Sequence, residues 1–353
     1  MAPSRQRNIE LFNKLNVLRI LAAFNIGGGV MVKSNKIVPA DMLEAIESCY
    51  QRCAEHVDEF ASQMDSQPAP ASVYHYTNST GLLGILESGK VRLTDIFGLN
   101  DPSELRHGVN HACEILAAEA LKDHSAAKLF AEKFIRVMGG GVQESAHFFV
   151  ACFSCDGDDL GQWRAYGDNG RGFALGFGGG LIEKAFVNVD ERGYGNAGFP
   201  VTYNDALLRK MHQLLVREVL PLIGMPFSRN LSDAATNEFM KELSIHLSVC
   251  VIRAAIFFKH EAYKNEQEYR FLQIREVNLP VDDLKHRTWG YSLIRFAEFD
   301  WKTRDQHALR EIVIGPAANE NDARLFARNC LLAGGFDPEK VIVRQSKIPY
   351  RSN

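Results

Sequence analysis

The chain has 353 residues, with 40 lysines and arginines against 43 aspartates and glutamates, and 46% of its residues are hydrophobic. Such proportions are typical of a globular protein, and this length accommodates one elaborated domain or two ordinary ones. The formal charge of −3 argues against a protein that binds nucleic acid mainly by neutralising phosphates, because that mode of binding needs an excess of basic residues. A local basic groove is still compatible with this composition.

The N-terminal segment lacks the pattern of a membrane span or a secretory leader. Its apolar run, Ile20 to Ile26, is far shorter than the roughly 20 residues that a span requires, and no small-residue cleavage site follows it. The seven cysteines are an odd number scattered along the chain, which favours reduced thiols. We therefore expect a cytoplasmic protein without membrane attachment. Residues 1–30 precede a second methionine, Met31, and are either a dispensable leader or a functional segment.

The first expected element is a long amphipathic helix. Apolar residues recur at helical spacing from Asp41 to Met64. The proline-containing stretch from Ser66 to Ala71 cannot continue a helix and is typical of a linker. These features divide the chain into an N-terminal part with the leader and the helix, residues 1–71, and a main domain, residues 72–351.

The main domain alternates strand and helix patterns, which predicts the α+β class. From Asp205 to Phe258 the pattern is almost wholly helical, with a break from Pro221 to Ser232, and we expect a helical insertion there. Strands are expected at 73–77, 90–95, 146–154, 171–177, 268–276, 292–299, 311–314 and 340–345. Further helices are expected at 79–88, 102–121, 126–138, 160–166 and 319–332.

Two groups of residues have part of a metal-binding pattern. Cys152 and Cys155 form a Cys-x-x-Cys pair, but zinc requires a second pair or histidines at ligand spacing, so a buried thiol in a strand is the favoured interpretation. Glu104, His107 and His111 share one face of an expected helix, but they lack the His-Glu-x-x-His order. Dinucleotide-binding, Walker and nucleophile-elbow motifs are absent as well. We therefore expect no metal.

Four segments are more polar or aromatic than a purely structural role requires. They are Tyr74 to Thr77, Asn100 to Glu104, Gly161 to Gly172 and Asn265 to Phe271. The third combines Trp, Tyr, two Arg and four Gly, a composition suited to stacking on a planar ring and contacting a phosphate. In the fourth, Glu266, Glu268 and Arg270 share one strand face. The local alternatives are an exposed face of self-paired charges there and a helix N-cap at Asp101.

Taken in order, these segments resemble a family of bacterial proteins known mainly as a domain of unknown function. The shared pattern is His-Tyr-Thr, Asn-Asp-Pro-x-Glu, Cys-Phe-Ser, Trp-x-x-Tyr-Gly, Gly-Phe-Ala-Leu-Gly-Phe, Glu-x-Glu-Tyr-Arg, Ile-Gly-Pro and Ser-x-Ile-Pro-Tyr-Arg. The matching positions are His75 to Thr77, Asn100 to Glu104, Cys152 to Ser154, Trp163 to Gly167, Gly172 to Phe177, Glu266 to Arg270, Ile314 to Pro316 and Ser346 to Arg351. The resemblance spans residues 73–351 and makes Asn100, Asp101 and Glu104 motif residues.

That family is in turn similar, in the order of its motifs, to the ADP-ribosyltransferase superfamily. Sites of that superfamily use a His or Arg on an early strand, an aromatic residue or Ser in a middle segment, and a Glu on a late strand. The resemblance implies a split β-sheet core with surrounding helices. It also implies NAD-binding and catalytic positions in this chain, which are His75, Tyr76, Thr77 and Trp163 for NAD binding and Tyr166 and Glu268 for catalysis.

The chemistry of NAD cleavage fits these residue types. Breaking the bond between nicotinamide and ribose develops positive charge on the ribose, which the carboxylate of Glu268 is suited to stabilise. Glu266 is a possible second acidic residue, as in the Glu-x-Glu of arginine-modifying members, although those members usually carry Arg where this chain has His75. Arg164 or Arg171 is suited to bind the pyrophosphate through two hydrogen bonds.

The resemblance implies an NAD-dependent mono-ADP-ribosyltransferase, a glycosyltransferase with NAD as co-substrate and a nucleic acid or a protein as acceptor. By analogy its context is a bacterial toxin or antiphage defence. One alternative is a module of the same fold that binds a nucleotide or nucleic acid without turnover. Another is an interaction protein that assembles through the helix at 41–64 and the helical insertion. The acceptor and the oligomeric state stay open.

Overall fold

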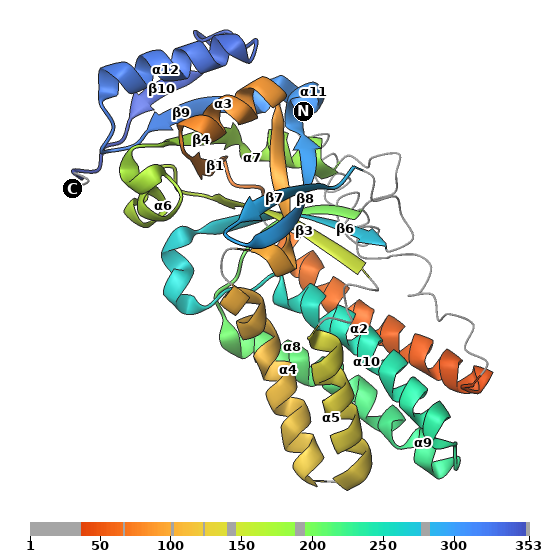
Figure 1. Ribbon diagram of the computed structural model, residues 1–353. Helices are drawn as coiled ribbons and strands as arrows, with labels where there is room; N and C mark the ends of the chain where they lie inside the picture. Colours follow the sequence, from red (N-terminus) through yellow and green to blue (C-terminus); the bar gives the residue numbers. More distant parts are fainter. Residues whose placement is uncertain are drawn as a thin grey trace, which may run out of the picture.

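A computed structural model describes residues 37–65, 68–99, 102–122, 124–139, 146–187, 195–276 and 283–350 (Figure 1). In these ranges the chain forms one mixed sheet with helices on both of its faces and a bundle of long helices beyond one face. The α+β class predicted from the sequence is therefore confirmed.

The helices of the bundle come from three separate parts of the chain. They are α2 (Ala40–Asp65), α4 (Pro102–Lys122), α5 (His124–Met138), α8 (Asp205–Ile223), α9 (Met225–Ser228) and α10 (Asp233–Ala255). Side-chain caps begin the two central ones, because Asn204 accepts a hydrogen bond from the Leu207 amide and Ser232 accepts one from the Ala235 amide. The break expected between residues 221 and 232 is thus a real boundary between helices.

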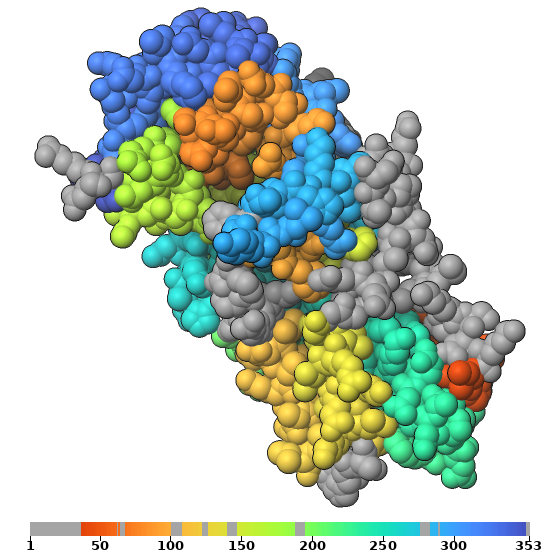
Figure 2. Space-filling view, viewed as in Figure 1, coloured from red at the N-terminus to blue at the C-terminus, as the bar shows by residue number. Residues whose placement is uncertain are grey.

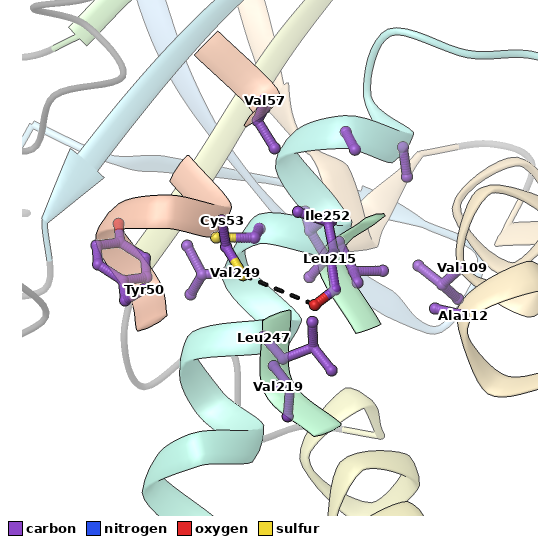
Figure 3. Close-up of a cluster of buried hydrophobic side chains, with 14 of the residues drawn as sticks. Tyr50, Cys53, Val57, Val109, Ala112, Leu215, Val219, Leu247, Val249 and Ile252 are labelled. Carbon is purple, nitrogen blue, oxygen red and sulfur yellow. Dashed lines mark hydrogen bonds between the residues drawn. The ribbon is translucent and has the colours of Figure 1, made fainter. Parts of the chain in front are cut away.

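The apolar stripe of α2 is buried against α8 and α10. Cys53 and Val57 lie in the shared core, and the Cys53 thiol donates a hydrogen bond to the Leu215 carbonyl at 3.8 Å (Figure 3). Helix α10 is buried on every side along its second half, which makes it the central helix of the bundle. The amphipathic helix expected at 41–64 therefore belongs to the same core as the helices of the middle of the chain.

The sheet has ten strands. They are β1 (Ser72–Thr77), β2 (Lys90–Asp95), β3 (Ala146–Ser154), β4 (Phe173–Gly178), β5 (Gly195–Pro200), β6 (Glu268–Glu276), β7 (Lys285–Trp289), β8 (Ser292–Asp300), β9 (Leu309–Ile314) and β10 (Ile342–Gln345). The main order is β10-β9-β4-β1-β3-β2-β8-β7, with β6 beside β3 and β5 beyond β6. Neighbouring strands are antiparallel, except that β9 and β10 are parallel.

The sheet forks at β3. One edge of β3 pairs with β6 along all nine residues. On the other edge, Ser154 pairs with β1, whereas Phe149 and Val150 pair with β2. Residues 151–153 lie between these two contacts and face the gap where β1 and β2 diverge.

Alternate residues of the central strands point into two different cores. Val150 and Leu272 belong to the core shared with the helical bundle. Phe149 and Phe271 belong to a second core on the opposite face. Short helices cover that face, namely α3 (Ser79–Ser88), α7 (Gly179–Val187), α11 (Trp301–Asp305) and α12 (Glu320–Ala333). The sheet is therefore the middle layer, and the fork is held rigidly from both sides.

Most expected elements are present. Two further helices, α7 and α11, and two further strands, β5 and β7, were not predicted from the sequence. Helix α7 begins at the glycine run 178–180, which was expected only to close a strand, and it buries Ile182 and Phe186. Strand β5 has the sequence Gly-Asn-Ala-Gly-Phe-Pro, which has little strand propensity and takes its pairing from β6. Strand β7 and helix α11 are five residues each, too short for a periodic pattern.

Within the described ranges no helix combines the length and the apolar composition that crossing a membrane requires.

Candidate functional site

A pocket of about 200 Å³ lies at the fork of the sheet. Strands β1, β2, β3 and β7 contribute to its wall, together with the start of β6 and the short helix α6 (Leu160–Ala165). Its lining residues are Tyr74, His75, Tyr76, Arg92, Thr94, Leu99, Val150, Ala151, Cys152, Phe153, Gln162, Tyr166, Lys259, Glu266, Glu268 and Arg287. Five of the residues that the sequence predicted for NAD binding or catalysis therefore meet here, namely His75, Tyr76, Tyr166, Glu266 and Glu268.

Hydrogen bonds to the loop before α6 hold Tyr76 of strand β1 in place. The Tyr76 hydroxyl donates to the Asp156 carbonyl at 2.8 Å and accepts from the Asp159 amide at 3.1 Å. Asp159 in turn caps α6, because its side chain accepts from the Gln162 amide at 2.8 Å. The positions of β1 and α6 across the pocket are thus coupled.

His75 is a neutral histidine at neutral pH. Burial lowers the pKa of its imidazole, and a hydrogen bond with the Cys152 backbone only partly opposes that shift. The ring also packs at 5.2 Å, centroid to centroid, from the Phe153 ring. A neutral imidazole of this kind can donate and accept one hydrogen bond each.

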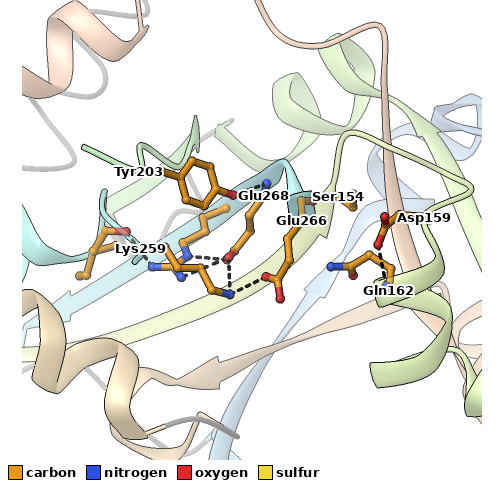
Figure 4. A network of polar contacts seen from close by, with 9 residues as sticks. Ser154, Asp159, Gln162, Tyr203, Lys259, Glu266 and Glu268 are labelled. Carbon is orange, nitrogen blue, oxygen red and sulfur yellow. Dashed lines mark hydrogen bonds and ion pairs between the residues drawn. The ribbon is translucent and has the colours of Figure 1, made fainter. Parts of the chain in front are cut away.

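A cluster of buried charges occupies the end of the pocket at β6 (Figure 4). The carboxylate of Glu268 lies 2.5 Å from Arg270 Nε and 3.0 Å from Lys259 Nζ. The same lysine lies 2.6 Å from the carboxylate of Glu266. The side chains of Lys259, Glu268 and Arg270 are only 3–4% exposed, whereas that of Glu266 is 21% exposed.

The two cations keep Glu268 ionised. Burial alone raises the pKa of this carboxyl, but the charges of Arg270 and Lys259, with hydrogen bonds from Arg270 and Cys152, outweigh it and lower the pKa to about 2. Burial raises the pKa of the adjacent Tyr203 to about 12, so its hydroxyl stays protonated and accepts from the Glu268 amide at 3.0 Å. Glu268 is therefore ionised at every physiological pH, and Lys259 and Arg270 balance the charge of the two carboxylates.

Local backbone geometry brings the two glutamates together. Gln267 has a left-handed backbone with φ of 44° and separates the 3₁₀ helix η4 (Glu261–Glu266) from β6. The end of β3 fixes this turn, because the Ser154 hydroxyl donates to the Glu266 carbonyl at 2.7 Å and the Cys155 amide donates to the Gln267 carbonyl at 2.8 Å. The Cys-Phe-Ser segment thus supports the Glu-x-Glu segment.

Several sequence candidates lie away from the pocket wall. Trp163 is fully buried beside Tyr76, and its indole N–H donates to Asp158 at 2.9 Å. Arg164 and Arg171 are exposed, and Arg171 pairs with Asp168 across 3.5 Å. Thr77 is half-buried at the end of β1, and neither it nor these three residues line the pocket.

The glycines of the segment 161–172 serve close packing. A Cβ atom on Gly172 would lie 2.2 Å from the Thr77 carbonyl oxygen, and one on Gly167 would lie 2.6 Å from the Trp163 ring. Close backbone approach therefore explains these glycines.

The expectation that Cys152 is a buried thiol was wrong. Cys152 is exposed and lines the pocket, because residue 152 faces the gap of the fork rather than a neighbouring strand. Glu268 and Arg270 do share one face, as expected, but this face is buried rather than exposed. The residues Asn100 and Asp101 lie outside the described part of the chain, and for Glu104 only its place in helix α4 is described.

Other residues that line the pocket were not predicted from the sequence. Lys259 follows the end of α10, and its amide donates to the Thr202 carbonyl at 3.0 Å, so a tertiary contact places it. Arg92 and Thr94 alternate with buried residues on β2, and this period of two was the available signal for a polar face. Arg287 lies on a strand that the sequence analysis did not find. Within the described ranges no cluster of His, Cys, Asp and Glu has the arrangement of a metal site.

Comparison with known proteins identifies a domain in a part of the chain that contributes to this pocket. A family model described as a protein of unknown function, DUF2971, matches residues 162–271. The match begins at Gln162 in the pocket wall and includes Lys259, Glu266 and Glu268. The chain therefore contains a DUF2971 domain, and a domain of unknown function is confirmed over these residues. No curated protein and no solved structure matches the chain.

Proposed function

We propose that this protein is an NAD-dependent mono-ADP-ribosyltransferase that modifies a nucleic acid or a protein. One observation carries the proposal. A single pocket holds an early-strand histidine, His75, a middle aromatic residue, Tyr166, and a late-strand glutamate, Glu268. These are the three residue types, in the chain order, that the resemblance to ADP-ribosyltransferases implies. The split of the sheet between β1 and β2 supports the same kind of fold.

In the proposed reaction the bond between ribose C1′ and nicotinamide breaks. Nicotinamide leaves with the electron pair of that bond, an acceptor nucleophile bonds to C1′, and the acceptor loses its proton to solvent or to a nearby carboxylate. Positive charge develops on the ribose before the new bond forms. The ionised carboxylate of Glu268 stabilises that charge and accepts a hydrogen bond from the ribose hydroxyl.

The remaining pocket residues bind and orient NAD. His75 is neutral and hydrogen-bonds the adenosine-side ribose. Tyr166, whose side chain is 43% exposed at the pocket mouth, stacks on the nicotinamide. Glu266 is more exposed than Glu268 and is the carboxylate better placed to meet the acceptor. All seven cysteines are free thiols, which agrees with the cytoplasmic location that we propose.

A second candidate function is a nucleotide-binding module without turnover. It is favoured by the pairing of Glu268, because Arg270 lies against one of its carboxylate oxygens and both Lys259 and Arg270 lie against the other. A carboxylate held by two cations exerts a weaker field on a substrate than an unpaired one does.

The test is nicotinamide release from NAD by the full-length protein, with and without cell lysate as a source of acceptors. Glu268→Gln is expected to lower the release rate at least ~100-fold while NAD affinity changes by only a few fold. Tyr166→Ala removes an exposed side chain and tests the pocket without breaking the buried charge cluster. Glu320→Gln, a surface glutamate paired with Arg324, is the matched control.

Release that requires the pocket residues and spares the control supports a transferase. NAD binding without release, in a protein that circular dichroism shows to be folded, supports the binding module instead. A folded protein that neither binds NAD nor releases nicotinamide would contradict both candidates.

A further inference from the structure

Strands β2 and β7 contribute Arg92, Thr94 and Arg287 to the pocket wall, and β8 lies between these two strands in the sheet. On one face of these strands lie Lys90 and Arg92 of β2, Glu298 of β8, and Lys285 and Arg287 of β7. Figure 2 shows the β7–β8 hairpin on the viewed face of the molecule, in light blue. Asp300, which is opposite Lys90, shares this face, so the face carries four cations and two carboxylates.

The carboxylate of Glu298 forms ion pairs with both lysines. Glu298 Oε2 lies 3.2 Å from Lys90 Nζ and 3.0 Å from Lys285 Nζ. On each strand the arginine lies two residues beyond the lysine, on the same face, and both arginines line the pocket. The guanidinium of Arg92 lies over the Phe296 ring, 4.7 Å from its centroid, which fixes its direction.

Arg92 and Arg287 bring two like charges to the wall of one pocket. Burial is the main cause that lowers the pKa of Arg287, and the charge of Arg92 is the second. Holding two like charges beside a pocket costs free energy. A bound anion between them would offset that cost, and guanidinium groups match the geometry of phosphate oxygens.

The acidic residues of the pocket do not offset this positive charge. Glu266 and Glu268 belong to the cluster with Lys259 and Arg270. The charges of that cluster therefore balance one another, and Arg92 and Arg287 add two guanidinium groups to the rest of the pocket wall.

We propose that Arg92 and Arg287 form a phosphate subsite, with the hydroxyl of Thr94 beside them, and that the ligand of this pocket is a nucleotide whose phosphates lie between β2 and β7. The orientation of its sugar toward Glu268 rests on the proposed function. The subsite itself rests on the arginine pair. It assigns the anion to residues other than Arg164 and Arg171, which do not line the pocket.

The test compares the binding of ADP and adenosine to the full-length protein by calorimetry, since these probes differ only in the phosphates. Wild type is expected to bind ADP roughly 10- to 100-fold more tightly than adenosine. Arg92→Gln and Arg287→Gln are each expected to remove most of that difference and to leave adenosine affinity unchanged. Arg164→Gln and Arg171→Gln are matched controls and are expected to keep it.

Each outcome decides the proposal. Equal affinity for ADP and adenosine in wild type, or an unchanged preference in both Arg92→Gln and Arg287→Gln, would overturn it, and so would loss of the preference in the control variants. A phosphate preference that needs Arg92 and Arg287 in a protein that releases no nicotinamide would keep the subsite and reject the transferase. Nicotinamide release with an NAD KM unchanged in both pocket variants would keep the transferase and reject the subsite.

Discussion

Glu268 at the pocket and His212 in the helical bundle are both buried titratable side chains, but one is charged and the other is neutral. At the pocket, Glu268 stays charged because Arg270 and Lys259 surround it, which lowers its pKa to about 2. In the bundle, His212 is fully buried beside His111, with ring centroids 6.4 Å apart, and burial lowers its pKa to about 3, so it is neutral at neutral pH. Nearby cations thus keep Glu268 charged, whereas burial keeps His212 neutral.

The largest effect is expected from breaking the buried charge cluster. Lys259→Met removes the cation shared by Glu266 and Glu268 and leaves buried carboxylates with fewer partners. We expect the free energy of unfolding to fall by about 3–5 kcal/mol, measured by urea denaturation. Lys285→Met, which loses a surface pair with Glu298, is the control and is expected to change it by about 0–1 kcal/mol. Equal effects of the two variants would mean that the cluster is not a distinct buried network.

The next effect concerns the bundle, where apolar packing rather than charge holds the helices together. Leu215 of α8 is fully buried against α2 and α10. Leu215→Ala is expected to lower the free energy of unfolding by about 2–5 kcal/mol, through lost burial and the cavity left behind. Leu121→Ala removes an exposed leucine of α4 and is the control. A small effect at Leu215 would show that this core rearranges freely.

The neutral histidine predicts a pH dependence. The pKa of His212 is about 3 in the folded protein against 6.5 ordinarily, so the unfolded chain binds a proton that the folded chain excludes. The free energy of unfolding therefore falls as the pH falls from 6.5 towards 3, by up to ~1.4 kcal/mol per pH unit. Comparison of wild type with His212→Met isolates this contribution in urea titrations at several pH values.

Other groups titrate in the same pH range, and their contributions to the free energy of unfolding cancel when wild type is compared with His212→Met. Burial raises the pKa of Asp58 to about 6 even though Arg253 opposes the shift, so its contribution has the opposite sign, and stability is lost as pH rises from 3.8 to 6. Both proteins contain Asp58, so the difference between them reports on His212. A difference that does not change with pH would contradict a buried neutral histidine.

The same contrast explains what the sequence could and could not predict. Periodicity located nearly all the long elements, because a stripe such as that of α2 has to be buried whatever covers it. It also placed Glu268 and Arg270 on one face. It could not show that the face is buried, nor that Lys259 reaches it, because both depend on how α10 ends against β6. Trp163 was assigned to NAD binding from the resemblance and from the composition of its segment, and neither distinguishes a pocket wall from the core behind it.

The smallest effect is expected at the C-terminal Ser-x-Ile-Pro-Tyr-Arg segment, which holds the loop before α6 in place. The Ser346 hydroxyl donates to the Asp158 carboxylate at 2.5 Å and accepts from the Ile348 amide at 3.1 Å, while Asp158 also accepts from Trp163. Ser346→Ala is expected to lower the free energy of unfolding by about 1 kcal/mol. Ser228→Ala, an exposed hydroxyl bonded to the Met225 carbonyl, is the control.

This variant also separates support from binding. Ser346 does not line the pocket, so Ser346→Ala is expected to leave ADP affinity within about two-fold while melting earlier in thermal denaturation. A large loss of affinity with unchanged stability would place the tail in the ligand site itself. Loss of both together would instead mean that the loop before α6, through Asp159 and Tyr76, sets the width of the pocket.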